Sequence, residues 1–259
     1  MIETIKFDLT ASMAIIKKPD SNETYYTYDF PHKIMLLGLL GAIIGLNGYN
    51  YYAWKKFLGQ EVENMPEFYE KLHPLKIAII PKIKRKNFNR KIQTFNNSVG
   101  YASDEKGNNL VVKEQWLEKP YWQIYILQSD IPEYEKIKSY LSCQKCEYIP
   151  YIGKNDHFAQ IKNVEIFQAQ ETLFANQIDS LFEKTIIKEI EDKLDDLVAF
   201  MQEENIQEEE YEYQELLPTK LSEKIGYYDF KSFLFTNKKI QLQTSQPLYQ
   251  IKNKIVYYF

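Results

Sequence analysis

The sequence predicts an α+β fold: a ferredoxin-like (RRM-like) domain with the order strand, helix, strand, strand, helix, strand over residues 1–170. Two patterns support this prediction. Short segments alternate apolar and polar residues, as half-buried strands do, and two other segments carry their apolar residues at helical spacing. The chain has 259 residues, 44% of them hydrophobic and 15% aromatic, which is ample for a core.

Four segments are predicted as the strands of this sheet. In the first, TIKFDL, the side chains of Ile5, Phe7 and Leu9 lie on one face. Lys6 and Asp8 lie on the other face, so this strand is expected to be half-buried. The other predicted strands are residues 75–83, 122–127 and 164–167.

The first predicted helix is the apolar run at residues 34–46. As a helix it spans roughly 20 Å, whereas a bilayer core needs about 30 Å, so the run is expected to be a core helix packed on the sheet. Its glycines do not have the spacing of a Walker loop or of a dinucleotide-binding turn. They recur instead at helical spacing together with Ala42, giving a smooth face that another backbone can approach closely: Gly38, Gly41, Ala42 and Gly45.

The second predicted helix is IPEYEKIKSYL at residues 131–141. Pro132 is expected in its first turn, and Pro31 in the first turn of the first helix. At the N-terminus, Met1 leads directly into Glu3 and Lys6 rather than into an apolar leader. We therefore expect a cytoplasmic protein.

A long insertion separates the two middle strands, and its local charge differs from that of the whole chain. The formal net charge of −4 argues against a general nucleic-acid binder. Residues 71–103, however, contain eight Lys or Arg residues and no Asp or Glu, interleaved with aromatic rings and asparagines. That combination suits single-stranded RNA, and the alternative is a solvated basic hairpin.

The charge changes sign farther along the chain. Residues 188–215 contain twelve acidic residues and two lysines, which predicts a solvated acidic helix and a linker. Beyond Pro218 three short β-forming runs predict a small β-rich C-terminal subdomain: residues 227–235, 240–242 and 255–259. The predicted division is therefore 1–170 and 171–259.

Three stretches in a fixed order resemble the CRISPR-associated RAMP proteins: FDLTASMAIIKKP, TYYTYDFPHKIMLLGLLGAIIGL and YIPYIGKNDHF. More narrowly, the chain resembles the subunit numbered five of type I Cascade complexes, and it is most similar to the type I-B variety. The N-terminal resemblance covers residues 5–46, and ELLPTKL near Pro218 adds weaker support.

Some positions depart from the family pattern. Lys17 stands where the family often has arginine, so the charge is kept but the bidentate fork is lost. Ile16 stands where an aromatic residue is usual, and His32 where a second proline is common. Gly153 is a single glycine where nucleolytic relatives in the superfamily often carry a richer loop.

The resemblance implies a non-catalytic subunit that needs no cofactor or metal and does not act at a membrane. Such a subunit binds the 5′ handle of the CRISPR RNA (crRNA), caps the backbone filament and helps the large subunit position target DNA in antiviral defence. The implied partners are crRNA, the backbone RAMP subunit, the large subunit and, through the complex, target DNA. The family's thumb, a long β-hairpin, would map to residues 82–119. The implied RNA-binding residues are Lys17, Lys18, Tyr28, Lys33, Lys82, Lys84, Arg85, Lys86, Asn87, Phe88, Arg90, Lys91, Gly153 and Lys154.

The alternative is an enzyme. In type I-C systems the corresponding subunit is a metal-independent endoribonuclease that processes precursor crRNA. Here His157, just beyond the Gly153 turn, would be the general base, with Lys154 beside it. Cys143 and Cys146 form a single CxxC, which is half of a structural zinc site, so we expect a reduced pair without metal.

Overall fold

The computed structural model describes residues 1–21, 23–61, 65–83, 88–96, 111–190, 210–222, 227–243 and 246–259. At its centre lies a six-stranded sheet in the order β15-β14-β8-β1-β7-β4. Every neighbouring pair in it is antiparallel. The strands are β1 (Ile2–Thr10), β4 (Ile77–Pro81), β7 (Tyr121–Leu127), β8 (Gln160–Thr172), β14 (Leu248–Ile251) and β15 (Lys254–Val256).

Helix α1 (Lys33–Ile44) follows β1, and helix α4 (Glu133–Ser142) follows β7. Along the chain the principal elements are therefore β1, α1, β4, β7, α4 and β8, with the sheet order β8-β1-β7-β4 among the strands. The predicted α+β class is confirmed. Both prolines lie outside their helices, because Pro132 is the N-cap of α4 and Pro31 precedes the N-cap of α1. The placement of these prolines in the first helical turn was wrong.

Helix α1 is apolar on nearly all sides, and eight of its twelve residues are buried in the core. Its remaining face, with Met35, Gly38 and Ala42, is only partly covered. The close approach at its glycines is made by the short helix α3 (Glu67–Leu72). A Cβ added to Gly41 would lie 2.7 Å from Phe68 Cβ, so only glycine fits there without a shift. In the described ranges no single helix is long and apolar enough to cross a membrane; α1 and α2 (Tyr49–Phe57) meet the length and composition criteria only together, bent by 82°.

His32 caps α1, and burial makes it sensitive to acid. Its Nδ1 accepts a hydrogen bond from Met35 N at 3.2 Å, and burial lowers its pKa to about 4. Because this pKa is lower than in the unfolded chain, the neutral ring contributes stability above pH 6.5 that is lost as the pH falls towards 4. We expect His32→Asn, which keeps an N-capping side chain, to remove up to about 3 kcal/mol of the acid destabilisation. Urea unfolding from pH 7 to pH 4 tests this, and an unchanged pH dependence in the variant would contradict it.

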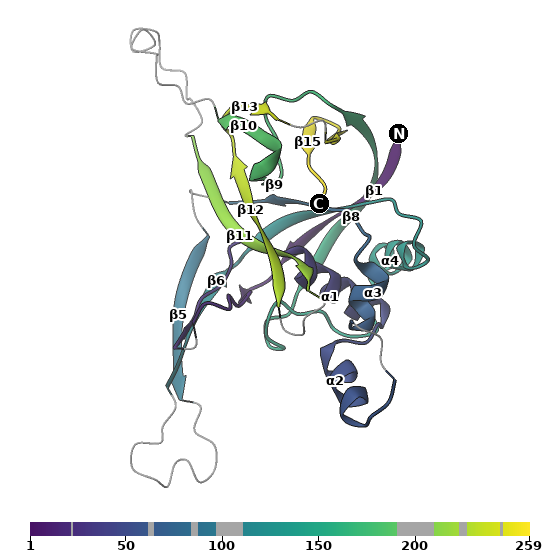
Figure 1. Ribbon diagram of the computed structural model, residues 1–259, viewed down its shortest axis with the longest axis vertical. Helices are drawn as coiled ribbons and strands as arrows, with labels where there is room; N and C mark the ends of the chain where they lie inside the picture. The colour runs from purple at the N-terminus through teal and green to yellow at the C-terminus, as the bar shows by residue number, and fades with distance from the viewer. Residues whose placement is uncertain are drawn as a thin grey trace.

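Beside the main sheet, β5 (Asn89–Asn96) and β6 (Val111–Glu118) pair antiparallel from Asn89↔Glu118 to Asn96↔Val111. Two short strands pack onto β6: β2 (Met13–Ala14), antiparallel, and β3 (Thr24–Tyr25), parallel. We call β5 and β6 the β5–β6 arm, and Figure 1 shows it extending away from the main sheet. The arm therefore starts next to the N-terminal segment that carries Lys17 and Lys18.

The described residues after β8 form mainly short strands. One sheet has the order β11-β12-β9, a separate pair joins β10 and β13, and β14 and β15 extend the main sheet. Residues 191–209 of the acidic run lie outside the described residues, but the run starts within β10 and ends within β11, so its ends are not helical. The division at residue 170 stays a prediction. The remaining elements are β9 (Phe182–Glu183), a 3-10 turn (Lys184–Ile186), β10 (Ile187–Ile190), β11 (Glu212–Leu221), β12 (Tyr228–Thr236) and β13 (Ile240–Leu242).

Strand β1 is buried on both faces, so the expectation of a half-buried strand was wrong. Lys6 and Asp8 are only 5% and 4% exposed. They form an ion pair with Lys6 Nζ 3.0 Å from Asp8 Oδ1. Asp8 also accepts hydrogen bonds from Asn163 Nδ2 at 2.7 Å and Tyr121 Oη at 2.9 Å. These contacts replace water, which is how two charged groups are accommodated inside.

Candidate nucleic-acid interface

The segment between β2 and β3 folds back on itself and carries two of the predicted cations. Lys18 N donates a hydrogen bond to Tyr26 O at 2.8 Å, which closes the segment. Lys17 is exposed, with its Nζ 3.5 Å from the centre of the Tyr25 ring. Tyr28 is only 3% exposed, and Lys18 Nζ lies 4.9 Å from the centre of its ring. Lys17 is thus open to a ligand, whereas Tyr28 supports the loop from inside.

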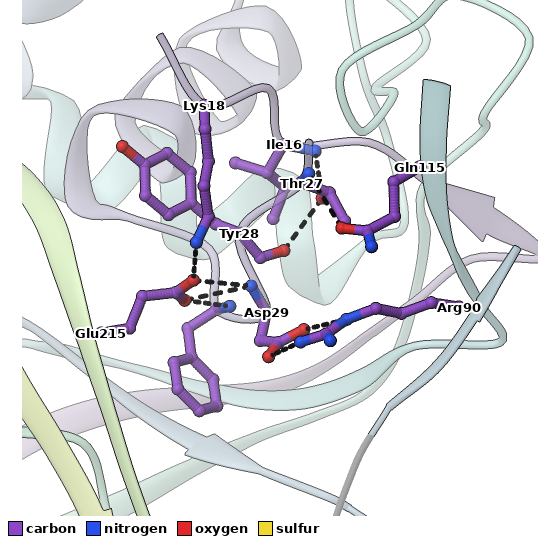
Figure 2. Close-up of polar contacts among 9 residues, drawn as sticks. Ile16, Lys18, Thr27, Tyr28, Asp29, Arg90, Gln115 and Glu215 are labelled. Atoms are coloured by element: carbon purple, nitrogen blue, oxygen red, sulfur yellow. Dashed lines mark hydrogen bonds and ion pairs between the residues drawn. The ribbon is translucent and has the colours of Figure 1, made fainter. Parts of the chain in front are cut away.

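Glu215 of β11 holds this segment in place (Figure 2). Its carboxylate lies 2.8 Å from Lys18 Nζ and accepts hydrogen bonds from Asp29 N at 3.0 Å and Phe30 N at 3.3 Å. Burial raises the pKa of Glu215, and the neighbouring Lys18 ammonium opposes that rise. Lys18 is therefore already paired with a buried carboxylate, and its charge is largely neutralised within the protein.

Arg90, at the base of the β5–β6 arm, is paired in the same way. Its guanidinium contacts both carboxylate oxygens of Asp29, with Nε 3.2 Å from Oδ1 and a shorter contact from Nη2 to Oδ2 (Figure 2). Lys91, the next residue, is exposed. Phe88 is 8% exposed and packs on Trp122 with ring centres 5.7 Å apart. Lys91 is thus open to phosphate, while Arg90 and Phe88 are committed to the fold.

Two further predicted cations lie elsewhere. Lys82 is near Lys254, whose pKa is lowered to about 8 by burial and by the adjacent Lys82 ammonium. Lys33 lies in a separate cavity at the start of α1. The rest of the basic segment lies outside the described residues: Lys84, Arg85, Lys86 and Asn87.

Gly153 brings the later motif against the N-terminal segment. It has a φ of +85°, in the left-handed region that favours glycine. Ile15 N donates to Ile152 O at 3.3 Å, and a Cβ on Gly153 would lie 1.6 Å from Ile15 O. The turn and β2 are therefore packed backbone to backbone. This contact joins two motifs that are far apart in the sequence.

Lys154 and His157 follow this turn and pack against β6. Lys154 Nζ lies 3.0 Å from a Glu114 carboxylate oxygen and 5.0 Å from the centre of the Phe95 ring. His157 is 5% exposed, with its ring edge-on to Trp116 at 4.6 Å between centres. Both of its ring nitrogens are buried and have no hydrogen-bond partner among the described residues, and burial lowers its pKa. His157 therefore packs inside the fold and does not face an open site in this arrangement.

A groove of about 740 Å³ lies beside the Gly153 turn, and its aromatic lining was not predicted. One wall is α1 and another is the start of α2, a helix with no buried residue. Four tyrosines of the lining are exposed by 46% to 58%: Tyr49, Tyr51, Tyr148 and Tyr151. Asn47 and Asn50 add amide groups. The sequence signal for the groove was present in YNYY at residues 49–52 and in YIPY at residues 148–151.

The chemistry of this lining fits unstacked bases. Exposed tyrosine rings stack on bases of any sequence, and asparagine amides hydrogen-bond to base edges. Lys55 Nζ lies 4.8 Å from the centre of the Tyr51 ring and adds positive charge next to the groove. The arrangement can therefore hold a short single strand with its bases against the tyrosines.

The part of the chain that the structure describes contains no candidate metal-binding site. No three His, Cys, Asp or Glu side chains come together there in a way that could hold an ion. Cys143 and Cys146 are exposed free thiols at the end of α4.

Comparisons with known proteins identify the fold. No family model matches the sequence, and no curated protein matches it. A crystal structure of a CRISPR protein from Archaeoglobus fulgidus is similar, with 9% identity, 98% of each chain covered and a TM-score of 0.50. A chain of a CRISPR RNA-guided surveillance complex has 10% identity over 92% of this chain and 91% of its own, with a TM-score of 0.48. A crystal structure of a Cas protein has 11% identity over 93% and 96%, with a TM-score of 0.44. The chain therefore shares its fold with a solved CRISPR protein.

Proposed function

We propose that this protein is a non-catalytic subunit of a type I CRISPR Cascade complex that binds the 5′ handle of crRNA. The observation that carries the proposal is the tyrosine-lined groove beside the Gly153 turn. Exposed rings and amides around a groove are what single-stranded RNA recognition requires. The fold shared with a solved CRISPR protein supports the same assignment.

The proposal extends to the architecture and to the partners. The sheet order β8-β1-β7-β4 supports a ferredoxin-like RAMP domain, and the β5–β6 arm between β4 and β7 supports the assignment of a thumb. As subunit five of a type I-B complex, the protein would cap the backbone filament next to the backbone RAMP subunit. It would also position the large subunit for target DNA recognition in the cytoplasm.

The burial of His157 favours a non-catalytic role over the endoribonuclease alternative. A general base must reach the 2′-hydroxyl within hydrogen-bond distance, and both ring nitrogens of His157 are buried. Lys154 is engaged by Glu114. We therefore expect no metal-independent cleavage of repeat RNA.

Removal of the exposed rings should weaken RNA binding. In the double variant Tyr148→Ala and Tyr151→Ala, the affinity for labelled handle RNA should fall about tenfold or more, because each stacked base contributes roughly 1–3 kcal/mol. Fluorescence anisotropy measures this affinity, with a scrambled RNA of equal length to test preference for the handle.

Lys17→Ala and Lys91→Ala should each make the RNA affinity less dependent on salt concentration. Each exposed ammonium can neutralise a phosphate of the RNA and release its counterion, and the variant loses that contribution.

The matched control is Phe174→Ala. Phe174 is 87% exposed and does not line the groove, so its removal should leave RNA affinity unchanged. Equal losses in the control and the tyrosine variant, or no binding by the wild type, would contradict the proposal. If the protein cleaves repeat RNA without metal and His157→Ala abolishes the cleavage, the protein is instead the endoribonuclease that processes precursor crRNA.

A further inference from the structure

A second cavity, of about 210 Å³, lies where α1 begins, between α3 and the strands β11 and β12. Three lysines line it: Lys33 from α1, Lys220 from β11 and Lys231 from β12. None of its lining residues is shared with the tyrosine groove. The remaining lining is Tyr69, His73, Glu183, Thr219 and Phe259.

The positive charge in this cavity exceeds the negative charge. Glu183 is buried, and its two carboxylate oxygens each lie 2.9 Å from Lys231 Nζ, so this pair is internally neutralised. Lys33 and Lys220 have no ion pair with any described residue. Burial, together with repulsion from the Lys220, Lys76 and Lys231 ammoniums, lowers the pKa of Lys33 to about 8, although the Glu183 carboxylate opposes this shift. An anion between Lys33 and Lys220 would relieve both the desolvation and the repulsion.

A neutral hydrogen-bond donor in the cavity lining indicates which class of anion the cavity can bind. Tyr69 Oη accepts a hydrogen bond from Leu221 N at 3.0 Å, which leaves its own proton available to donate into the cavity. Two ammoniums and a hydroxyl suit a doubly charged group with several acceptor oxygens. Glu183 is already taken by Lys231, so it does not supply a competing free carboxylate.

We propose that this cavity binds a phosphate monoester dianion through Lys33 and Lys220. The site is independent of the RNA groove, and the phosphate group can come from a free phosphate compound or from the phosphorylated end of a nucleic acid. Lys33 was expected from the sequence to contact RNA; in this assignment it contacts a single phosphate group instead.

Calorimetric titration with inorganic phosphate at pH 7 and constant ionic strength tests the site. Lys33→Met keeps most of the apolar stem and removes the charge, so affinity for phosphate should fall about tenfold or more with the loss of a charge-assisted hydrogen bond. Affinity of the wild type should also fall as the pH rises beyond about 8, where Lys33 loses its proton. Lys162→Met is the matched control, because Lys162 is an exposed lysine of β8 outside the cavity.

The possible results distinguish a phosphate site from no site, and they also distinguish the two sources of phosphate. Phosphate affinity that is unchanged by Lys33→Met, or absent from the wild type, would overturn the proposal. Lys220 is exposed, so Lys220→Met gives the same test if Lys33→Met does not fold. Tighter binding of 5′-phosphorylated RNA than of 5′-hydroxyl RNA, lost in Lys33→Met, would support the site with a nucleic-acid end as source. Equal binding of the two RNAs with intact phosphate binding would support it with a free phosphate compound.

Discussion

Gly153→Ala is expected to destabilise the fold by about 3 kcal/mol or more, which is in the range of the severe single substitutions. Two costs combine at this position. The residue has a φ of +85°, and an added Cβ would lie 1.6 Å from Ile15 O, which is backbone and cannot rotate away. The β2 segment and the Gly153 turn must then separate. Urea unfolding measures the stability, and the same variant should lose RNA affinity because the groove is lined by Gly153 and Tyr151.

Gly59→Ala is the control that separates the two costs. Gly59 has a φ of +66°, in the same left-handed region, but no atom of the described residues lies within 4 Å of an added Cβ. It should therefore show only the conformational cost, about 1 kcal/mol. If the two variants lose equal stability, the backbone contact between Gly153 and Ile15 contributes nothing and the proposed junction is wrong.

The elements that the sequence predicted well are those whose signal is local. The apolar run at residues 34–46 became α1, and the run at residues 240–242 became β13 with the same bounds. WQIYIL became most of β7 because alternation over six residues is specific for a strand. Such patterns are visible without knowing what the element packs against.

Features set by distant partners were not predicted. The alternation of apolar and polar residues in β1 predicted that one face is exposed to solvent. Lys6 and Asp8 on that face are instead buried, in the strand that pairs with β7 and β8. Helix α2 was missed because its nine residues have no apolar face turned towards a core. The pairing of β14 with β8, which adds C-terminal residues to the main sheet, was also not predicted. None of these three features produces a recognisable pattern in the nearby sequence.

The candidate site was predicted only in part for a related reason. Counting charges along the sequence overestimates what is free to bind RNA, since Arg90 and Lys154 are paired with Asp29 and Glu114. Acidic partners that far away in the chain cannot be found from composition. The groove was missed because its lining comes from segments near residues 35, 50, 150 and 228. Aromatic runs alone do not show that their rings face one space.

Glu215→Ala should destabilise the protein by about 3 kcal/mol, because it leaves an ammonium and two backbone N–H groups without their acceptor. The groups affected are Lys18 Nζ, Asp29 N and Phe30 N, which all converge on this carboxylate (Figure 2). Glu212→Ala is the matched control on the same strand. Glu212 is paired with Lys238 at 3.3 Å but is 38% exposed, so its loss should cost less than about 1 kcal/mol.

A further variant at the same position, Glu215→Gln, separates charge from hydrogen bonding. Its amide oxygen can still accept from Asp29 N, whereas Lys18, whose side chain is 27% exposed, can turn towards water. Glu215→Gln should therefore retain more than half of the stability that Glu215→Ala loses, as measured by urea unfolding. If Gln is as damaging as Ala, the ion pair with Lys18 is what fixes the N-terminal segment, and Lys18→Met should then be equally damaging. If Glu212→Ala is as damaging as Glu215→Ala, burial does not distinguish the two carboxylates, and Glu215 is not what holds the segment between β2 and β3 in place.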